Sequence, residues 1–334
     1  MLIYLGDITY DQKSTQAPVP LNAAYVAAHA KRKFGDQVTI KLFKSPAKLL
    51  SAIDDQTPDI LGLSHYIWNG RLNEFVINYA RKKCKNLIVV AGGPNFKNDN
   101  ISVQKYLTKH KETDYLILFA GEVPFTNLIE HFLASKPTER FKGANIIGCF
   151  TLNDSGQLIG EPYVDNRKEL DYLPSPYLNG WLEPFLKDGY LPIFETNRGC
   201  PYSCSFCVWG IHALTKVKQF SLERVFGELD YVYGLGLSHV QWLFADANFG
   251  ILKRDAEIAK RLRQMHDERP DTFSYVDIFW AKNPTPTMTE VARQLKDLTM
   301  GYIAFQSLDN TVLSAIERKN ISTERLMIFV EEIK

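Results

Sequence analysis

The chain has 334 residues, 45% of them hydrophobic and 23% charged, with a formal net charge of +1 at pH 7. This balance gives no electrostatic sign of a nucleic-acid surface, and no apolar run reaches the length of a membrane span. The length allows two domains, each with its own core.

Strands and helices alternate along the first part of the chain. Apolar runs predict strands at residues 1–7, 37–43, 59–66, 86–93 and 114–122, and helical spacing predicts helices at 21–35, 46–58 and 71–84. This alternation is typical of a doubly wound α/β domain with a parallel sheet, which we expect over residues 1–135. In such a Rossmann-like domain, ligands bind at the carboxyl ends of the strands.

Three segments lie at the carboxyl ends of these predicted strands, and two of them contain glycine. They are SHYIWN at 64–69, GGPN at 92–95 and GEVPF at 121–125. Glycine at a strand end lets the backbone approach a flat or phosphorylated ligand, and it also makes ordinary tight turns. No GxGxxG pattern is present, which disfavours binding of a nicotinamide or flavin dinucleotide.

Residues 136–190 are predicted to be a connector between two domains. The residues Asp154, Ser155 and Gly156 predict the turn of a small hairpin within it. Pro174 and Pro176 disfavour regular structure in the strap that follows.

The alternation restarts at residue 191. Strands are predicted at 191–196, 239–246, 272–282 and 302–308, and helices at 221–236, 253–268, 287–301, 310–319 and 322–334. A closed βα barrel has more than four βα units, so we expect residues 191–334 to form the first part of a truncated barrel. The open strand edge at 302–308 would need a partner or a missing carboxyl-terminal segment to complete it.

Three of the five cysteines lie within eight residues. Cys200, Cys204 and Cys207 form a C-x3-C-x2-C pattern on the loop after the strand at 191–196. Such a loop places three thiolates around one point, whereas structural zinc needs four protein ligands. Cys84 and Cys149 lie in the other half of the chain, without a partner at zinc-ligand spacing. Three local ligands indicate an iron–sulfur cluster with one open iron, and the cysteine usage indicates a reducing compartment, the cytoplasm.

The cysteine pattern, with Phe206 before its last cysteine, resembles the signature of the radical S-adenosylmethionine (SAM) superfamily. The segments SHYIWN, AGGPNF, FAGEVPF, SPYLNG, FADANFG and QSLDNTVLSAIERKN resemble motifs of the branch in which a cobalamin-binding domain precedes the barrel. The resemblance extends over the whole chain. It implies a cobalamin-binding Rossmann-like domain followed by a partial radical SAM barrel.

The resemblance also implies roles for individual residues. The three clustered cysteines would each ligate one iron of a [4Fe–4S] cluster, and the fourth iron would bind the amino and carboxylate groups of SAM. Reduction of the bound SAM by one electron would then give a 5′-deoxyadenosyl radical. The residues expected to bind SAM are Phe206 at the adenine, Asp246 and Asn248 at the methionine end, and Gln306 and Ser307 at the ribose. Many members have Gly-Gly-Glu where this chain has Asp246-Ala247-Asn248, and ordinary strand-end caps are the alternative for these polar residues.

The cobalamin site is expected in the first domain. Domains that supply a histidine ligand to cobalamin carry Asp-x-His-x-x-Gly after the first strand, whereas this chain has Asp7 there and no histidine. We therefore expect cobalamin to bind without a histidine from this loop, and we expect His65 to be a wall residue. The residues expected to cradle the corrin and its tail are Ser64, Gly92, Gly93, Gly121 and Glu122.

The resemblance implies cobalamin-dependent C-methylation of a small molecule, or a related radical reaction, with an electron donor such as flavodoxin or ferredoxin. Two alternatives stay open. One is a non-catalytic module in which the cysteines hold structural zinc, and a metal count separates it from an iron–sulfur protein. The other is a methylthiotransferase-type radical enzyme acting on RNA, which needs a basic domain that this chain does not show.

Overall fold

The computed structural model describes residues 1–10, 17–135, 143–211, 214–283, 285–301, 304 and 306–333. The chain folds into two units, Met1–Asn166 and Arg167–Lys334, which we call unit 1 and unit 2. In the part of the chain that is described, no helix is long and apolar enough to cross a membrane.

Unit 1 is built on one seven-stranded sheet. Its strands are β1 (Leu2–Gly6), β2 (Thr39–Phe43), β3 (Ile60–Ser64), β4 (Ile88–Gly92), β5 (Tyr115–Ile117), β6 (Cys149–Leu152) and β7 (Leu158–Ile159). The order across the sheet is β2-β1-β3-β4-β5-β6-β7. The first five strands pair in parallel, with Leu5 opposite Leu42 on one side and Gly62 on the other. All but the last residue of β3 and of β4 are buried, as expected for a parallel sheet covered on both faces.

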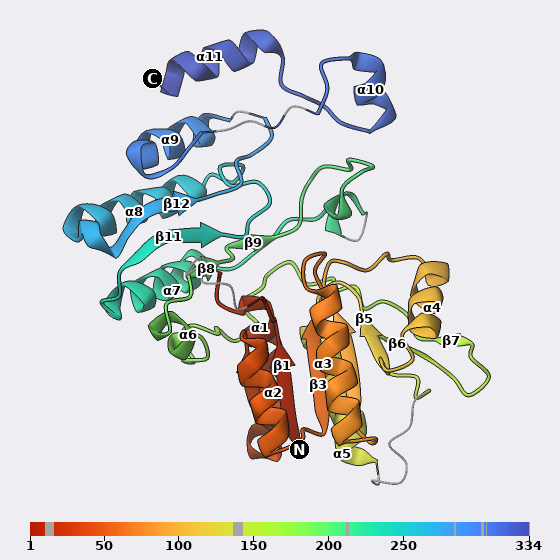
Figure 1. Ribbon diagram of the computed structural model, residues 1–334. Helices are drawn as coiled ribbons and strands as arrows, with labels where there is room; N and C mark the ends of the chain where they lie inside the picture. The colour runs from red at the N-terminus through yellow and green to blue at the C-terminus, as the bar shows by residue number, and fades with distance from the viewer. Residues whose placement is uncertain are drawn as a thin grey trace. The chain divides into compact units, whose positions relative to one another are not determined.

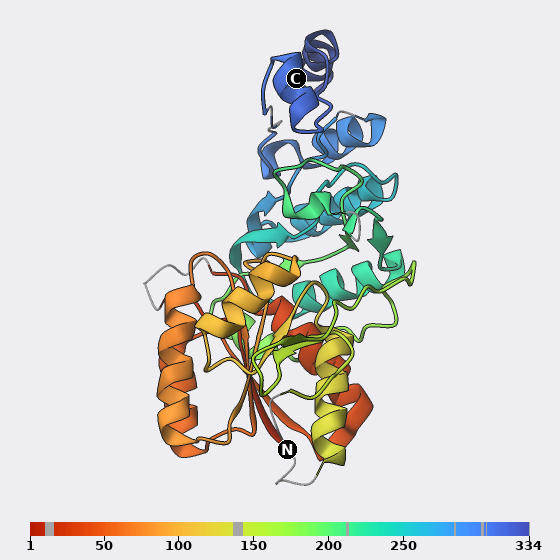
Figure 2. The ribbon, with the colours of Figure 1, turned by 90° about the vertical axis from the view of Figure 1, so that its right-hand side faces the viewer.

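Helices cover both faces of this sheet. They are α1 (Leu21–Phe34), α2 (Pro46–Asp55), α3 (Gly70–Lys83), α4 (Asn100–Lys109) and α5 (Glu122–Ala134). Helix α1 packs on α5, and α2 packs on α3. Figure 2 shows α3 (orange) and α5 (yellow) on opposite sides of the strands. The sequence predicted the doubly wound arrangement, although α4 and α5 were not predicted as helices.

Local side chains fix where these helices begin. Ser45 precedes Pro46 at the start of α2, and its hydroxyl accepts a hydrogen bond from the Lys48 backbone N–H. Asp99 caps α4 in the same way by accepting from the backbone N–H of Ser102. Each cap ends the loop that follows a strand, and so it fixes the position of the strand-end segment.

The predicted hairpin is present but belongs to the sheet of unit 1. Strand β6 pairs antiparallel to β5, and β7 pairs antiparallel to β6. Asn153 begins the turn, and Gly156 takes a positive φ of 78° in it. The unpaired edge of β5 accepts β6, so the described residues 143–166 extend the first unit rather than linking two domains.

Unit 2 contains a three-stranded parallel sheet and a two-stranded antiparallel one. Its strands are β8 (Ile193–Phe194), β9 (Asn197–Arg198), β10 (Lys218–Gln219), β11 (His239–Phe244) and β12 (Phe273–Asp277). Its helices are α6 (Glu183–Lys187), α7 (Leu222–Gly234), α8 (Asp255–Glu268), α9 (Pro286–Leu295), α10 (Asn310–Ala315) and α11 (Thr323–Ile333). The parallel order is β12-β11-β8 (Figure 1). Strand β9 pairs antiparallel with β10.

An aromatic stack forms the centre of the parallel sheet. Trp242 on β11 is fully buried, with its ring 5.2 Å from that of Phe194 on β8 and 4.7 Å from that of Phe273 on β12. The described residues thus show the first three predicted βα units. In the predicted fourth strand, Tyr302, Ile303 and Phe305 lie outside the described residues, and Gln306 and Ser307 are not part of a strand.

Candidate functional site

The three clustered cysteines lie on a tight loop of unit 2, residues 199–210, which we call the cysteine loop. It runs from the end of β9 to a short 3-10 helix, η3 (Val208–Gly210). Gly199 has φ +105°, and a Cβ there would lie 2.4 Å from the Lys216 backbone oxygen. A Cβ on Gly210 would lie 2.3 Å from the Cys204 backbone oxygen. Both glycines are therefore needed for the loop to close on itself.

The thiols of this loop are mostly withdrawn from solvent. Cys200 and Cys204 are each 3% exposed, and Cys207 is half-buried. The backbone N–H of Cys207 donates to the carbonyl of Cys204 at 3.0 Å, which turns the chain between these two cysteines. The backbone N–H of Cys200 donates to the carbonyl of Leu214, which closes the loop at its other end.

Two of the sulfur atoms accept hydrogen bonds from distant parts of unit 2. The Sγ of Cys200 accepts from the Asn248 amide Nδ2 at 3.2 Å and from the Lys282 Nζ at 3.7 Å. The Sγ of Cys204 accepts from the Arg318 Nη1 at 3.8 Å. The sequence predicted Asn248 as a site residue, but it did not single out Lys282 or Arg318. Their only sequence signal was a basic residue at the carboxyl end of a predicted element, since Lys282 ends the predicted strand 272–282 and Arg318 lies near the end of the predicted helix 310–319.

The cysteine loop fits an iron–sulfur cluster by the chemistry of its donors. Among the described residues, no three His, Cys, Asp or Glu side chains form a group that could hold a single metal ion. A [4Fe–4S] cluster takes each cysteine on a different iron, so its ligands need not converge on one atom. Three thiols on one loop, two of them buried and hydrogen-bonded, are the donors that such a cluster requires.

Asp246 has a different set of contacts from the predicted one. It is fully buried, and its Oδ1 accepts from the backbone N–H groups of Thr196 and Asn197 at 2.8 and 3.1 Å. Its Oδ2 accepts from the Thr196 hydroxyl at 2.6 Å. Burial raises the pKa of Asp246 to about 7. The carboxylate thus binds the turn between β8 and β9, and its predicted contact with SAM stays a prediction.

The remaining predicted SAM-binding residues lie at the surface or near it. Phe206 is 55% exposed on the cysteine loop, so its ring is free to pack against a ligand. Gln306 is exposed, and the Ser307 hydroxyl accepts from the backbone N–H of Asp309 at 3.0 Å. The structure therefore brings Asn248 to the cysteines, whereas the Ser307 hydroxyl accepts a local hydrogen bond from its own loop.

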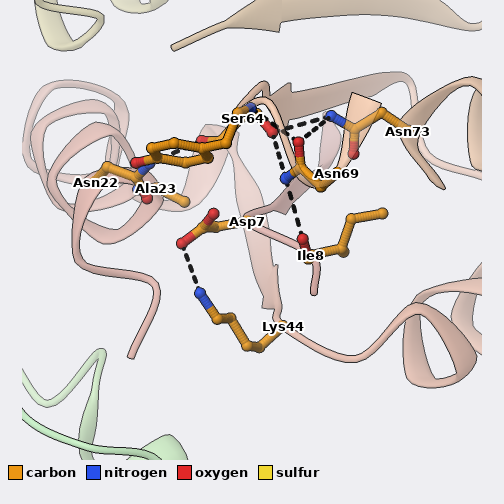
Figure 3. Close-up of polar contacts among 9 residues, drawn as sticks. Asp7, Ile8, Asn22, Ala23, Lys44, Ser64, Asn69 and Asn73 are labelled. Carbon is orange, nitrogen blue, oxygen red and sulfur yellow. Dashed lines mark hydrogen bonds and ion pairs between the residues drawn. The ribbon is translucent and has the colours of Figure 1, made fainter. Parts of the chain in front are cut away.

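In unit 1, the predicted residue Ser64 is the centre of a hydrogen-bond network at the end of β3. We call Asn22, Ser64, Tyr66, Asn69 and Asn73 the strand-end network. The Asn22 amide donates to the Ser64 hydroxyl at 3.0 Å, and the Asn69 and Asn73 amides each donate to the Ser64 carbonyl at 3.0 Å (Figure 3). These contacts tie α1, β3 and α3 together.

A buried ion pair lies at the end of the neighbouring strand. The Lys44 ammonium donates to the Asp7 carboxylate at 2.9 Å, and both residues are less than a tenth exposed (Figure 3). Asn69 of the strand-end network reaches the same strand end, because its amide also donates to the Ile8 carbonyl. Asp7, which the sequence placed in a loop without a histidine, is thus held by a lysine.

The glycines predicted to cradle a cofactor have differing surroundings. Gly93 has φ +111°, and a Cβ there would lie 2.6 Å from the His65 backbone oxygen, so the protein's own backbone requires this glycine. Gly92 and Gly121 have no such constraint, because a Cβ on either would make an ordinary van der Waals contact or one at its limit. Glu122 begins α5 and is 4% exposed.

His65 is a core residue and not an exposed ligand. It is 3% exposed, its ring packs on Phe96 and Tyr106, and its Nε2 has no hydrogen-bond partner among the described residues. Burial, with a smaller contribution from the charge of His110, lowers the pKa of His65 to about 4. His65 is thus buried in the core of unit 1, and its expected place in the wall of the cobalamin site stays a prediction.

The sequence reading did not single out two exposed apolar residues beside this histidine. Ile67 is 85% exposed and Trp68 is 58% exposed. The Trp68 ring stacks on Tyr66, with centroids 4.5 Å apart and planes 11° from parallel. Ile67 and Trp68 thus give the end of β3 an exposed apolar area beside the strand-end network. In the sequence, the only indication of this apolar area was Trp68 in the segment SHYIWN.

The whole fold resembles that of known cobalamin-dependent radical SAM enzymes. The structure of one such enzyme, OxsB, with aqua-cobalamin and SAM bound, matches 99% of this chain and 47% of its own, with TM-score 0.70 and 16% identity. The radical SAM methyltransferase TsrM from Kitasatospora setae, with cobalamin and a [4Fe–4S] cluster bound, matches 99% of this chain and 65% of its own, with TM-score 0.68 and 15% identity. No family model matches the chain.

Two proteins are similar in sequence as well. The cobalamin-dependent radical SAM methyltransferase TokK of Streptomyces tokunonensis is 32% identical over 297 residues. The 2-(S-pantetheinyl)-carbapenam-3-carboxylate methyltransferase of Streptantibioticus cattleyicolor is 32% identical over 299 residues. Both matches cover 84% of this chain and 42% of the relative, so the chain spans less than half the length of these relatives.

The chain is therefore homologous to cobalamin-dependent radical SAM methyltransferases, and it has the fold of cobalamin-dependent radical SAM enzymes. This confirms the resemblance and the fold class predicted from the sequence. The comparisons favour neither the zinc module nor the RNA methylthiotransferase.

Proposed function

We propose that this chain carries out the cofactor-binding part of a cobalamin-dependent radical SAM methyl transfer to a small molecule. The observation that carries the proposal is the cysteine loop, in which Cys200 and Cys204 are buried and accept hydrogen bonds from amide and cationic side chains. The named activity of the TokK relative supports the methyl-transfer reaction.

In unit 2, Cys200, Cys204 and Cys207 are the residues that would hold a [4Fe–4S] cluster. Such a cluster supplies one electron to SAM, and cobalamin supplies a methyl group to the substrate. The protein's own contribution at this site is to hold the thiolates and to keep water away from them, because burial and hydrogen bonds at the sulfurs set the potential of a cluster. Phe206, exposed on the same loop, is free to contact the adenine of SAM.

In unit 1, the end of β3 is the surface that we propose for cobalamin. The half-buried members of the strand-end network, Asn22, Ser64 and Tyr66, supply hydroxyl and amide groups, and the exposed Ile67 and Trp68 supply apolar area. Gly92 ends β4, Gly121 precedes α5 and Glu122 begins it. We propose that the backbone of these residues extends the surface, because the Glu122 side chain is 4% exposed. His65 is buried, so we propose that cobalamin binds here without a histidine on its lower face.

The substrate class and the electron donor follow from the same proposal. One relative is named for a carbapenam substrate, and we propose only that the present substrate is also a small molecule. A flavodoxin or ferredoxin is the kind of protein that supplies single electrons at low potential. An oxygen-sensitive cluster with one open iron, in a chain whose cysteines form no disulfide among the described residues, requires a reducing compartment. We propose that this compartment is the cytoplasm.

The test is an anaerobic reconstitution of the full chain, with iron, sulfide, zinc and cobalt counted per chain. We expect about four irons and four sulfides and one bound cobalamin, with broad visible absorption that Cys204→Ala abolishes. Cys84→Ser is the matched control, because Cys84 lies on unit 1 after α3. Stoichiometric zinc with no iron uptake would contradict the proposal and support the structural-zinc module. Iron without cobalamin would limit the proposal to unit 2.

A further inference from the structure

Two cationic side chains contact the cysteine sulfurs. The Lys282 ammonium lies 3.7 Å from the Cys200 Sγ, and the Arg318 guanidinium lies 3.8 Å from the Cys204 Sγ. Both also lie over the ring of Tyr202, at 5.3 and 6.0 Å from its centroid. Tyr202 lies between Cys200 and Cys204 in the sequence, so both cations contact the cysteine loop through this ring as well as through the sulfurs.

The sheet of unit 2 positions Lys282. The chain continues beyond β11 and β12, and Phe249 pairs in parallel with Trp280 there. The backbone N–H of Ala281 donates to the Phe249 carbonyl at 2.8 Å, which brings the next residue, Lys282, beside Asn248. The Lys282 ammonium then donates to the Asn248 Oδ1 at 2.9 Å, while the Asn248 Nδ2 donates to Cys200. Lys282 therefore fixes the orientation of the Asn248 amide as well as contacting the sulfur.

The segment after α10 positions Arg318. The backbone N–H of Ser205, next to Cys204, donates to the Ile316 carbonyl at 3.1 Å. Arg318 follows two residues later, and its Nη2 donates to the Ala304 carbonyl at 3.0 Å. The side chain is 4% exposed, so its position is fixed by packing and by these hydrogen bonds.

The charges of the two side chains have no carboxylate partner among the described residues, which sets them apart from the buried Lys44–Asp7 pair. A buried cation without a counter-charge is costly, by several kcal/mol in general. This cost applies to Arg318, which is 4% exposed, and to a smaller degree to Lys282, which is half-buried. In the part of the chain that the structure describes, the groups within hydrogen-bond distance that can carry a negative charge are the thiols of Cys200 and Cys204. The electrostatic environment of the loop is therefore matched to anionic sulfur.

We propose that Lys282 and Arg318 are positioning residues that hold Cys200 and Cys204 as cluster ligands and raise the reduction potential of that cluster. The inference rests on the proposed cluster in unit 2. Reduction adds one electron to the cluster, and cations that donate to its sulfurs stabilise the reduced form more than the oxidised form. Removal of either cation makes the reduced cluster harder to form.

The experiment measures the midpoint potential of the reconstituted full chain by an EPR-monitored redox titration. The variants are Lys282→Met, which removes the charge and keeps the chain length, and Lys282→Arg, which keeps the charge. Lys260→Met is the matched control, since Lys260 is an exposed lysine on α8. We expect Lys282→Met to lower the equilibrium constant for reduction of the cluster about tenfold. This corresponds to a midpoint potential about 59 mV lower for one electron. Lys282→Arg and Lys260→Met should stay close to the wild type, and Arg318→Lys should shift less than Arg318→Met.

Each outcome bears on the inference. A midpoint potential unchanged in both Lys282→Met and Arg318→Met, at full iron content, overturns it and leaves the proposed function standing. If Lys282→Met takes up no iron while Lys282→Arg does, Lys282 holds Cys200 in place, as proposed. If both Lys282 variants lose iron, and their cluster-free forms also unfold at a lower temperature than the cluster-free wild type, then Lys282 is only structural and the inference fails. Wild-type protein that takes up no iron overturns the proposed function and this inference together.

Discussion

The buried carboxylate of Asp246 binds Thr196 twice, through its backbone N–H at 2.8 Å and its hydroxyl at 2.6 Å. Thr196 lies four residues before Cys200, at the turn between β8 and β9. Asp246 follows β11, so this one side chain joins the end of a barrel strand to the segment that enters the cysteine loop. Its contacts explain why the loop begins where it does.

Replacement of Asp246 by Ala should lower the free energy of unfolding by about 2–4 kcal/mol. The variant leaves two buried backbone N–H groups and one hydroxyl without their acceptor. Urea unfolding of the cluster-free protein measures the change. The control is Asp230→Ala, which removes an exposed ion pair with Arg261 and should cost less than about 1 kcal/mol. An Asp246→Ala variant that is fully stable but no longer binds SAM would favour the direct SAM contact that the sequence predicted.

The buried His65 should make stability depend on pH. Its folded pKa of about 4 lies below the unfolded value of about 6.5, so the unfolded chain binds the proton first as the pH falls. The contribution of His65 to stability is therefore complete above pH 6.5 and is lost between pH 6.5 and 4. Between pH 7 and 4.5 this group alone should cost about 2.5 kcal/mol. Urea unfolding at the two pH values should show a smaller loss in His65→Phe, and equal losses in both proteins would contradict the assignment.

Replacement of Gly93 by Ala should destabilise unit 1 by more than about 2 kcal/mol. The residue has φ +111°, and the new Cβ would lie 2.6 Å from the His65 carbonyl oxygen, which is backbone and cannot move aside cheaply. The control is Gly70→Ala at the start of α3, where a Cβ would meet no atom within 4 Å. Thermal unfolding should separate the two variants. Similar melting temperatures would show that the β4 turn adapts to a side chain.

Replacement of Trp68 by Ala should weaken cobalamin binding by about tenfold, because Trp68 supplies exposed apolar area beside the strand-end network. Titration with hydroxocobalamin, followed by its visible spectrum, measures the affinity. Phe75→Ala is the matched control, since Phe75 is 57% exposed on α3 and Trp68 is 58% exposed. The spectrum of the bound form should not change in His65→Phe. Equal affinity in Trp68→Ala and Phe75→Ala would place cobalamin elsewhere on unit 1, or nowhere on it.

Local patterns in the sequence were enough for the class of protein and for the three cysteines that we propose as cluster ligands. The spacing of Cys200, Cys204 and Cys207 is a property of eight consecutive residues. Continuous apolar runs such as 59–66 and 86–93 predict a buried parallel sheet without reference to the rest of the chain. The hairpin turn at Asn153–Gly156 is local in the same sense. The membership of that hairpin in the first sheet depended on the free edge of β5, which no local pattern shows.

Only the tertiary structure decided which groups surround the cysteines and which strand-end residues face inward. Lys282 contacts Cys200 across 82 residues of sequence, and Arg318 contacts Cys204 across 114. Nothing in either residue's neighbours predicts such a contact, because it results from the pairing of Phe249 with Trp280 and from the return of the chain after α10. A strand-end polar residue such as Asp246 has the same local pattern whether it binds a ligand or the backbone. The choice depends on which partner lies within hydrogen-bond distance once the sheet has formed, and for Asp246 that partner is the backbone of Thr196 and Asn197.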